Sequence, residues 1–231
     1  MAPKRPKRPA RTYTISLANR KPRGSGHERL GEILIAAKKL FAERGVENVT
    51  TREIAARVGI SQTALFTYYK NRDEIFDRLM EGAFRELALT LDAVTREATD
   101  TRDWLKRLIA GYIEFGLKHP DEYRLAFMVI KTHRRSEDLT RDRPGAVQRV
   151  GFPVFEKLER GIAEAMDKRV LRADIGPPAL VAQVMWAAIH GLTALLIARP
   201  RPHFPWASRD ELIAAQAELL LDGLLQRNAE E

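Results

Sequence analysis

The chain has 231 residues, of which 45% are apolar, so it is long and hydrophobic enough to bury a sizeable core. It contains no cysteine, which excludes disulfides, thiolate metal sites and cysteine nucleophiles. The formal net charge is +8, and the first 27 residues hold eight of the 39 basic residues and none of the 31 acidic ones. This proline-containing arm is predicted to be either a solvated tail or an extension that reaches toward phosphates.

The first predicted helix covers about residues 29–44, where apolar residues recur at helical spacing until Gly45. After a short connection, Thr50 and Glu53 have the spacing of a capping box, which predicts the start of a second helix. Gly59 predicts the end of that helix, because glycine readily adopts the left-handed conformation that often terminates helices.

A third short helix is predicted to begin at Ser61 and to run through Tyr69, and Asn71 with Glu74 predicts the start of a fourth. So short a break between two helices is typical of a helix-turn-helix, which presents its second helix at an angle. Helical spacing turns Ile60, Leu65 and Tyr69 inward and the following side chains outward: Gln62, Thr63, Thr67 and Tyr68. These outward side chains can form hydrogen bonds and carry no negative charge, so they suit contacts to base edges and phosphates.

The rest of the chain is predicted as a series of longer helices over about 104–118, 121–133, 146–168, 178–198 and 208–224. Residues 179–198 carry no charge and are numerous enough to cross a membrane. Their polar Gln183, His190 and Thr193 and their many alanines instead favour a buried interface helix in a soluble protein. No strand is predicted, and the expected fold class is all-α with about nine helices.

Residues 30 to 76, which include LIAAKKLFAERGVENVTTREIAARVGISQTALFTYYKNRDEIF, resemble the N-terminal pattern of the tetracycline-repressor (TetR) family of bacterial transcriptional regulators. WAAIHG, from Trp186 to Gly191, is similar to the Trp-xxx-His-Gly (WHG) signature of one TetR C-terminal domain type, and HPDEYRLAFMV is similar to another region of that type. The predicted domains are a basic arm over 1–27, a helix-turn-helix DNA-binding domain over 28–76 with its motif at about 50–69, and a C-terminal ligand-binding and dimerisation domain over 77–231.

The resemblance implies that the third helix is the recognition helix and enters the major groove of DNA. The residues that match DNA-contacting positions are Thr50, Thr51, Arg52, Ser61, Gln62, Thr63, Thr67, Tyr68, Lys70 and Arg72. Helix capping is a structural alternative for Thr50 and Ser61, and both roles are compatible. The chain departs from the family at Thr63, where glycine is common, and at Phe66, where tyrosine is frequent. For Phe66, as for Tyr69, packing into the core is the predicted role.

In the family, residues of the C-terminal domain line a pocket for a small, usually apolar ligand that shifts the spacing of the DNA-binding heads. The candidates in this chain are Trp104, Tyr112, Phe115, Phe127, Met128, Phe152, Phe155, Trp186 and His190. Core packing is the alternative for each of them. His190 is the most specific candidate, because an imidazole in an apolar helix must find a partner in a ligand, a backbone carbonyl or a second chain.

These features predict a homodimeric, sequence-specific transcriptional regulator of the cytoplasm and nucleoid, expected to be a repressor that a small apolar effector releases from a palindromic operator. The uncharged helix and the last helix are the expected dimer surfaces. The sequence lacks GxSxG, P-loop and HExxH motifs, and its five histidines lack zinc-site spacing, so neither catalysis nor a metal or cofactor is predicted. The alternative is a helical ligand-binding or scaffold protein whose helix-turn-helix no longer binds an operator.

Overall fold

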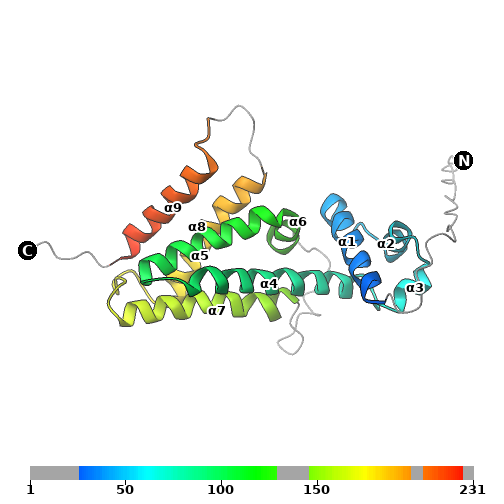
Figure 1. Ribbon diagram of the computed structural model, residues 1–231, viewed down its shortest axis with the longest axis horizontal. Coiled ribbons are helices and arrows are strands. Elements are labelled where there is room, and N and C mark those ends of the chain that lie inside the picture. Colours follow the sequence, from blue (N-terminus) through cyan, green and yellow to red (C-terminus); the bar gives the residue numbers. More distant parts are fainter. Residues whose placement is uncertain (1–25, 129–145, 199–204, 226–231) are drawn as a thin grey trace, which may run out of the picture. The chain divides into compact units, whose positions relative to one another are not determined.

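A computed structural model describes residues 26–128, 146–198 and 205–225, which contain nine α-helices and no β-strand (Figure 1). The predicted all-α class and helix number are therefore confirmed for these parts of the chain. Contacts between residues divide the chain into two compact units, one ending at Ile75 and the other beginning at Phe76. The basic arm lies outside the described residues except for its last two positions.

The first unit contains three helices and the first turn of a fourth. Their bounds are α1 (Gly26–Arg44), α2 (Thr51–Val58), α3 (Gln62–Phe66) and α4 (Arg72–Arg96), of which α4 continues into the second unit. Helix α2 packs against both α1 and α3. The apolar core between them includes Ile33 and Phe41 of α1, Ile54 of α2 and Leu65 of α3, all completely buried.

The second unit is a larger helical bundle around α8 (Figure 1). Besides the rest of α4, its elements are α5 (Thr101–Lys118), α6 (Pro120–Tyr123), the π-helix η2 (Arg124–Met128), α7 (Ala146–Asp167), α8 (Pro178–Ala198) and α9 (Arg209–Leu224). Helix α8 packs against α5 and α7, and α9 lies beside α5 and α8. Gln216 of α9 donates a side-chain hydrogen bond to the carbonyl of Ala188 in α8, at 2.8 Å.

Two predicted helices differ from the structure. The third was predicted to reach Tyr69, but α3 ends at Phe66. The Thr67 hydroxyl donates to the carbonyl of Ala64, at 2.7 Å, and the N–H groups of Thr67 and Tyr68 bond to carbonyls three residues back, which tightens the chain into a turn. The helix predicted over 121–133 begins in α6 but continues as the π-helix η2 as far as Met128, and its last five residues lie outside the described part.

Helix α8 is apolar on two opposite faces. One face, which includes Val181, Met185 and Ile189, is buried against its neighbours. The other includes Leu180, Val184 and Leu195, which are all exposed. By length and composition α8 is also the one described helix apolar enough to cross a membrane, with a mean hydropathy of 1.8. A single helix of this kind does not establish a membrane span, because core helices of soluble proteins have the same length and composition.

Candidate functional site

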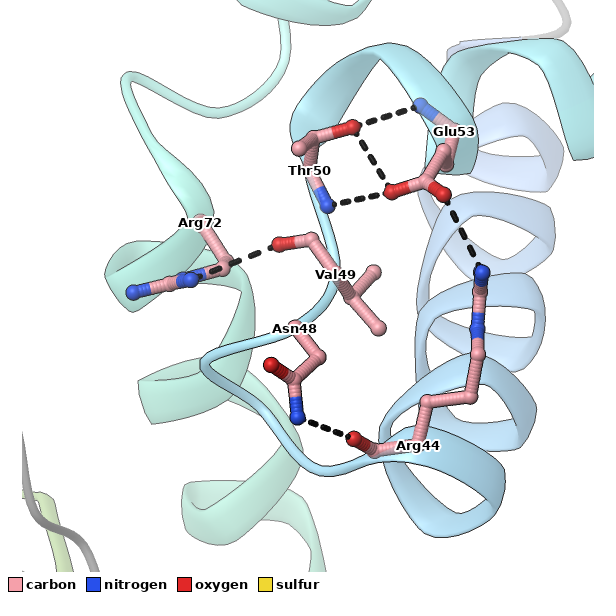
Figure 2. Close-up of polar contacts among 6 residues, drawn as sticks. All are labelled: Arg44, Asn48, Val49, Thr50, Glu53 and Arg72. Carbon is pink, nitrogen blue, oxygen red and sulfur yellow. Dashed lines mark hydrogen bonds and ion pairs between the residues drawn. The ribbon is translucent and has the colours of Figure 1, made fainter. Parts of the chain in front are cut away.

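The start of α2 is fixed by a complete capping box (Figure 2). The Glu53 N–H donates to the Thr50 hydroxyl oxygen at 3.2 Å, and the Thr50 N–H donates to the Glu53 carboxylate at 2.8 Å. Arg44, at the end of α1, donates to the same carboxylate at 3.1 Å. The hydrogen bonds from Thr50 chiefly, and the charge of Arg44 to a smaller extent, lower the pKa of Glu53. The capping role considered for Thr50 is therefore confirmed.

Arg72 holds the α1–α2 connection from the first turn of α4 (Figure 2). Its Nη1 donates to the carbonyls of Glu47, at 2.9 Å, and Val49, at 3.4 Å. Asn48 closes the same connection by donating to the Arg44 carbonyl at 2.9 Å. The guanidinium predicted to contact phosphate is thus part of the internal framework of the first unit, and a phosphate contact would have to use its remaining N–H groups.

The turn from α2 to α3 depends on Gly59, which has a φ of 76°. A residue with a Cβ would pay about 1–2 kcal/mol to adopt this left-handed conformation. The N–H groups of Gly59 and Ile60 donate to the carbonyls of Ala56 and Ala55, at 3.2 and 3.0 Å, which is the Schellman pattern. Ser61 then caps α3 by accepting from the Ala64 N–H at 3.1 Å, so its predicted capping role is also confirmed. The chain reverses within three residues and leaves both helix ends hydrogen-bonded.

A hydrogen bond between side chains joins the two helices of the motif. Gln62, at the start of α3, donates from its Nε2 to the hydroxyl of Thr51, at the start of α2, over 2.9 Å. Both residues were predicted as DNA contacts, but their pairing was not predicted, because eleven residues separate them in the sequence. The bond restricts the rotamer of Gln62 and leaves its Oε1 and one N–H available.

The predicted DNA-contacting residues are mostly accessible. Those exposed are Thr50, Arg52, Ser61, Gln62, Thr63, Thr67 and Lys70, whereas Thr51, Tyr68 and Arg72 are partly buried. Tyr69 is buried as predicted, with 5% of its surface accessible. The same prediction for Phe66 is wrong, because Phe66 is 47% exposed. It is the last residue of α3 and follows the fully buried Leu65, so the helix turns its side chain about 100° away from the direction of the core.

A second candidate site is an apolar cavity of about 350 Å³ within the second unit. Residues of α4, α5, η2, α7 and α8 line it: Phe84, Leu87, Leu91, Leu108, Tyr112, Phe127, Gly151, Phe152, Val154, Phe155, Lys157, Leu158, Gln183, Trp186 and Ile189. Its volume is at the lower end of the range of small-molecule sites. Apolar walls of this kind bind ligands by burying their hydrocarbon surface rather than by pairing charges.

Five predicted pocket residues line this cavity, namely Tyr112, Phe127, Phe152, Phe155 and Trp186. The other four do not, and for each of them the structure shows another environment. Trp104 packs directly over Gly161, where a Cβ would lie 2.3 Å from the indole. Phe115 stacks on His119 with ring centroids 4.7 Å apart, and Met128 is exposed.

His190 takes part in a chain of hydrogen bonds behind the cavity wall. The Trp186 indole N–H donates to the Tyr112 hydroxyl at 3.2 Å, which lies 3.4 Å from the Tyr123 hydroxyl. The Tyr123 hydroxyl is 2.5 Å from Nδ1 of His190. Burial lowers the pKa of His190 and raises that of Tyr123, so both are uncharged at neutral pH. The partner that His190 was predicted to need is therefore a tyrosine of its own chain.

The cavity residues of α4, which are Phe84, Leu87 and Leu91, were not predicted. Their spacing marks them as the apolar stripe of a helix, and a stripe that lines a cavity has the same spacing as one that packs solidly. Tyr123 was also missed as the partner of His190, because 67 residues separate the two in sequence.

A small unit with a capped helix-turn-helix and a separate helical unit with an apolar cavity together define a helix-turn-helix regulatory protein. Two family models match the chain: "Bacterial regulatory proteins, tetR family" over residues 33–79 and "Tetracyclin repressor-like, C-terminal domain" over residues 105–220. The chain belongs to the tetR family of bacterial regulatory proteins. The narrower WHG type remains a prediction.

Among proteins of similar sequence is the HTH-type transcriptional activator FasR of Mycolicibacterium smegmatis, 31% identical over 47% of this chain and 48% of FasR. The nucleoid occlusion factor SlmA of Haemophilus ducreyi is 30% identical over 45% of this chain and 52% of SlmA. The chain thus spans about half the length of these relatives. Among solved structures, the fatty acid degradation regulator FadR from Bacillus halodurans has the same fold, with a TM-score of 0.70, 17% identity and coverage of 90% of this chain and 100% of FadR.

The lowered pKa of Glu53 makes the stability of the first unit depend on pH. Because the folded-state pKa lies below the ordinary value of 4.5, the charged carboxylate stabilises the fold above that pH, and this contribution is lost as the pH falls through the lowered pKa. We expect Glu53→Gln, which keeps the box but not the charge, to be less stable than the wild type at pH 7 by about 0.5 kcal/mol or less, because solvent screens the partly exposed carboxylate, and we expect this difference to shrink as the pH falls below 4.5. Urea unfolding followed by circular dichroism measures this difference.

Thr50→Ala is the matched variant, because it removes the hydroxyl and keeps the carboxylate. It should cost about 1 kcal/mol at pH 7. A stability difference between Glu53→Gln and the wild type that does not change with pH would contradict the assignment.

Proposed function

We propose that this protein is a sequence-specific DNA-binding transcriptional regulator that acts at the nucleoid in the cytoplasm, with a regulatory rather than a catalytic role. The observation that carries the proposal is the outer face of α3, where Gln62 is held by Thr51 beside exposed Thr63 and Thr67. Glu53 is the only acid between residues 50 and 71, and its carboxylate is bound by Thr50 and Arg44. A face with amide and hydroxyl groups and no free carboxylate suits the edges of bases and the phosphates beside them.

Gln62 is the residue proposed to read a base directly. An amide side chain reads adenine through two hydrogen bonds, donating to N7 and accepting from N6. The hydrogen bond from Gln62 to Thr51 leaves the Oε1 acceptor and one N–H donor of Gln62 available, and a contact to adenine uses one acceptor and one donor. Because the rotamer is already restricted, less conformational entropy is lost on binding. Arg52 and Lys70, exposed near the two ends of the motif, are proposed to contact phosphates, or in the case of Arg52 a base edge.

A homodimer is proposed because a single short recognition helix reads few base pairs, and two copies on a palindromic operator double the contacts. The exposed face of α8 supports it. Leu180, Val184, Ala187, Gly191 and Leu195 follow one another at spacings of three or four residues and so form one apolar stripe. Leu219 of the adjacent α9 is also exposed. Such helices paired about a twofold axis would form a four-helix contact.

The cavity is proposed to bind a small apolar effector. Its lining is almost entirely hydrocarbon, and the Trp186 indole N–H at its wall is already bonded to Tyr112. A ligand that binds the free protein more tightly than the DNA-bound protein weakens DNA binding by the same factor by which DNA weakens ligand binding. We propose that the protein represses transcription and that the effector relieves this repression. The relative FasR, by contrast, is a transcriptional activator.

The alternative is a helical ligand-binding or scaffold protein without an operator. Selection of binding sites from random duplex DNA distinguishes this alternative from the proposed regulator. Recovery of a common palindromic sequence supports the regulator. Recovery of no common sequence supports the alternative.

The roles of Gln62 and Lys70 should differ in a measurable way. We expect Gln62→Ala to weaken binding to the selected duplex by about 1–3 kcal/mol per lost base contact and to relax the preference at one position in each half-site. Lys70→Gln should weaken binding to all duplexes alike and reduce the salt slope by about one per phosphate contact. Fluorescence anisotropy at several salt concentrations measures both. Lys118→Gln, an exposed change on α5, is the control, and unchanged affinity and preference in Gln62→Ala would refute the reading role.

The dimer surface can be tested at Val184, which is 59% exposed in the middle of the α8 stripe. In a twofold interface Val184→Glu buries one uncompensated charge from each protomer, at a cost of about 3 kcal/mol or more for each. We expect sedimentation equilibrium to show a dimer for the wild type and a monomer for the variant. Leu89→Glu, at a 63% exposed position on α4, should remain dimeric. A dimeric Val184→Glu protein would show that the interface lies elsewhere.

The effector site can be tested without knowing the effector. The neutral apolar dye N-phenyl-1-naphthylamine should bind the wild type with increased fluorescence, and Val154→Phe, which fills part of the cavity, should weaken dye binding about tenfold or more. Leu89→Phe, outside the cavity, is the control and should bind the dye normally. Equal dye affinity in the wild type and in Val154→Phe would place the dye at a different site.

A further inference from the structure

The exposed ring of Phe66 is the feature of the first unit that its internal packing does not explain. Phe66 follows Gln62 by four residues and Thr63 by three, so all three side chains lie on one face of α3. Only about half of its surface is covered by its own chain. Among the described residues of the first unit, Ile35 of α1 is the other exposed large apolar side chain, and it lies outside the helix-turn-helix.

The side chains around Phe66 limit the kinds of chemical group that can cover its ring. The exposed neighbours Gln62, Thr63 and Thr67 are uncharged and able to form hydrogen bonds. The phenyl ring itself has neither a donor nor an acceptor, so it can offer only apolar contact to whatever covers this face. In the major groove, base edges present hydrogen-bonding groups with one apolar exception, the C5-methyl group of thymine.

We propose that Phe66 contacts the C5-methyl group of a thymine in each half-site of the operator and thereby specifies thymine at that position. The inference rests on the proposed function, in which α3 lies in the major groove. Gln62 and Phe66, one helical turn apart, then read two nearby base pairs by different means, one through hydrogen bonds and the other through apolar burial. The threonine methyl group of Thr63 lies on the same face and can extend the apolar contact.

The test removes the methyl group alone. In the duplex obtained by selection, each thymine is replaced in turn by deoxyuridine, which keeps base pairing and every hydrogen-bonding group. We expect one position per half-site at which the wild type loses affinity about fourfold, the factor that corresponds to burying one methyl group. Phe66→Ala should bind the thymine duplex more weakly than the wild type and should lose little further affinity with deoxyuridine at that position. Fluorescence anisotropy of all four combinations completes the cycle.

Matched variants separate this effect from misfolding. Leu89→Ala, at an exposed position of α4, should keep the full preference for thymine over deoxyuridine. If thermal unfolding shows that Phe66→Ala is not folded, Phe66→Leu takes its place. Its preference for thymine over deoxyuridine must then differ from that of the wild type.

Three results would count against the inference. A wild type that binds every deoxyuridine duplex as tightly as the thymine duplex would overturn it. The same loss of affinity in the wild type and in the Phe66 variant would also overturn it. If selection recovers no DNA sequence, the proposed function fails, and this inference fails with it.

Discussion

The reversal of the chain at Gly59 is the constraint on which the first unit depends. The left-handed conformation there places the end of α2 and the start of α3 three residues apart, and hydrogen bonds satisfy both helix ends within that distance. The turn fixes the angle between the two short helices. Their packing against each other also stabilises both helices, since isolated helices of this length are unstable in water. Leu65 anchors α3 in the core, and Gln62, Thr63 and Phe66 remain exposed on the face proposed to contact DNA.

The second unit solves a different problem with α8. A helix that is apolar on both faces must bury each of them, and α5 and α7 cover only one. The exposed stripe supports the proposed contact between protomers, and the cavity on the buried side is the proposed ligand site. Both properties come from one segment, so an effector that moves α8 acts on a helix that also carries the proposed contact between protomers.

The parts of this structure that sequence predicts well are those set by neighbouring residues. The Thr50–Glu53 capping box, the Ser61 cap and the helix ends at Gly45 and Gly59 all follow from local chemistry, and the structure contains each of them. What escaped prediction depends on partners distant in sequence. The bond from Gln62 to Thr51, the pairing of Tyr123 with His190 and the packing of Trp104 over Gly161 each require the tertiary fold. The exposure of Phe66 was missed because an aromatic residue in a short helix is usually part of the core.

The hydrogen bond between Thr51 and Gln62 also bears on how such a protein changes during evolution. Because Thr51 holds the Gln62 amide, a substitution at position 51 can change the orientation of Gln62, and with it the base that Gln62 is proposed to read, while Gln62 itself stays the same. A related protein with glutamine at position 62 therefore cannot be assigned the same operator from α3 alone. In the proposed recognition, the choice of base therefore depends on two positions, 51 and 62, on two different helices, and a substitution at position 51 can change the base that residue 62 selects.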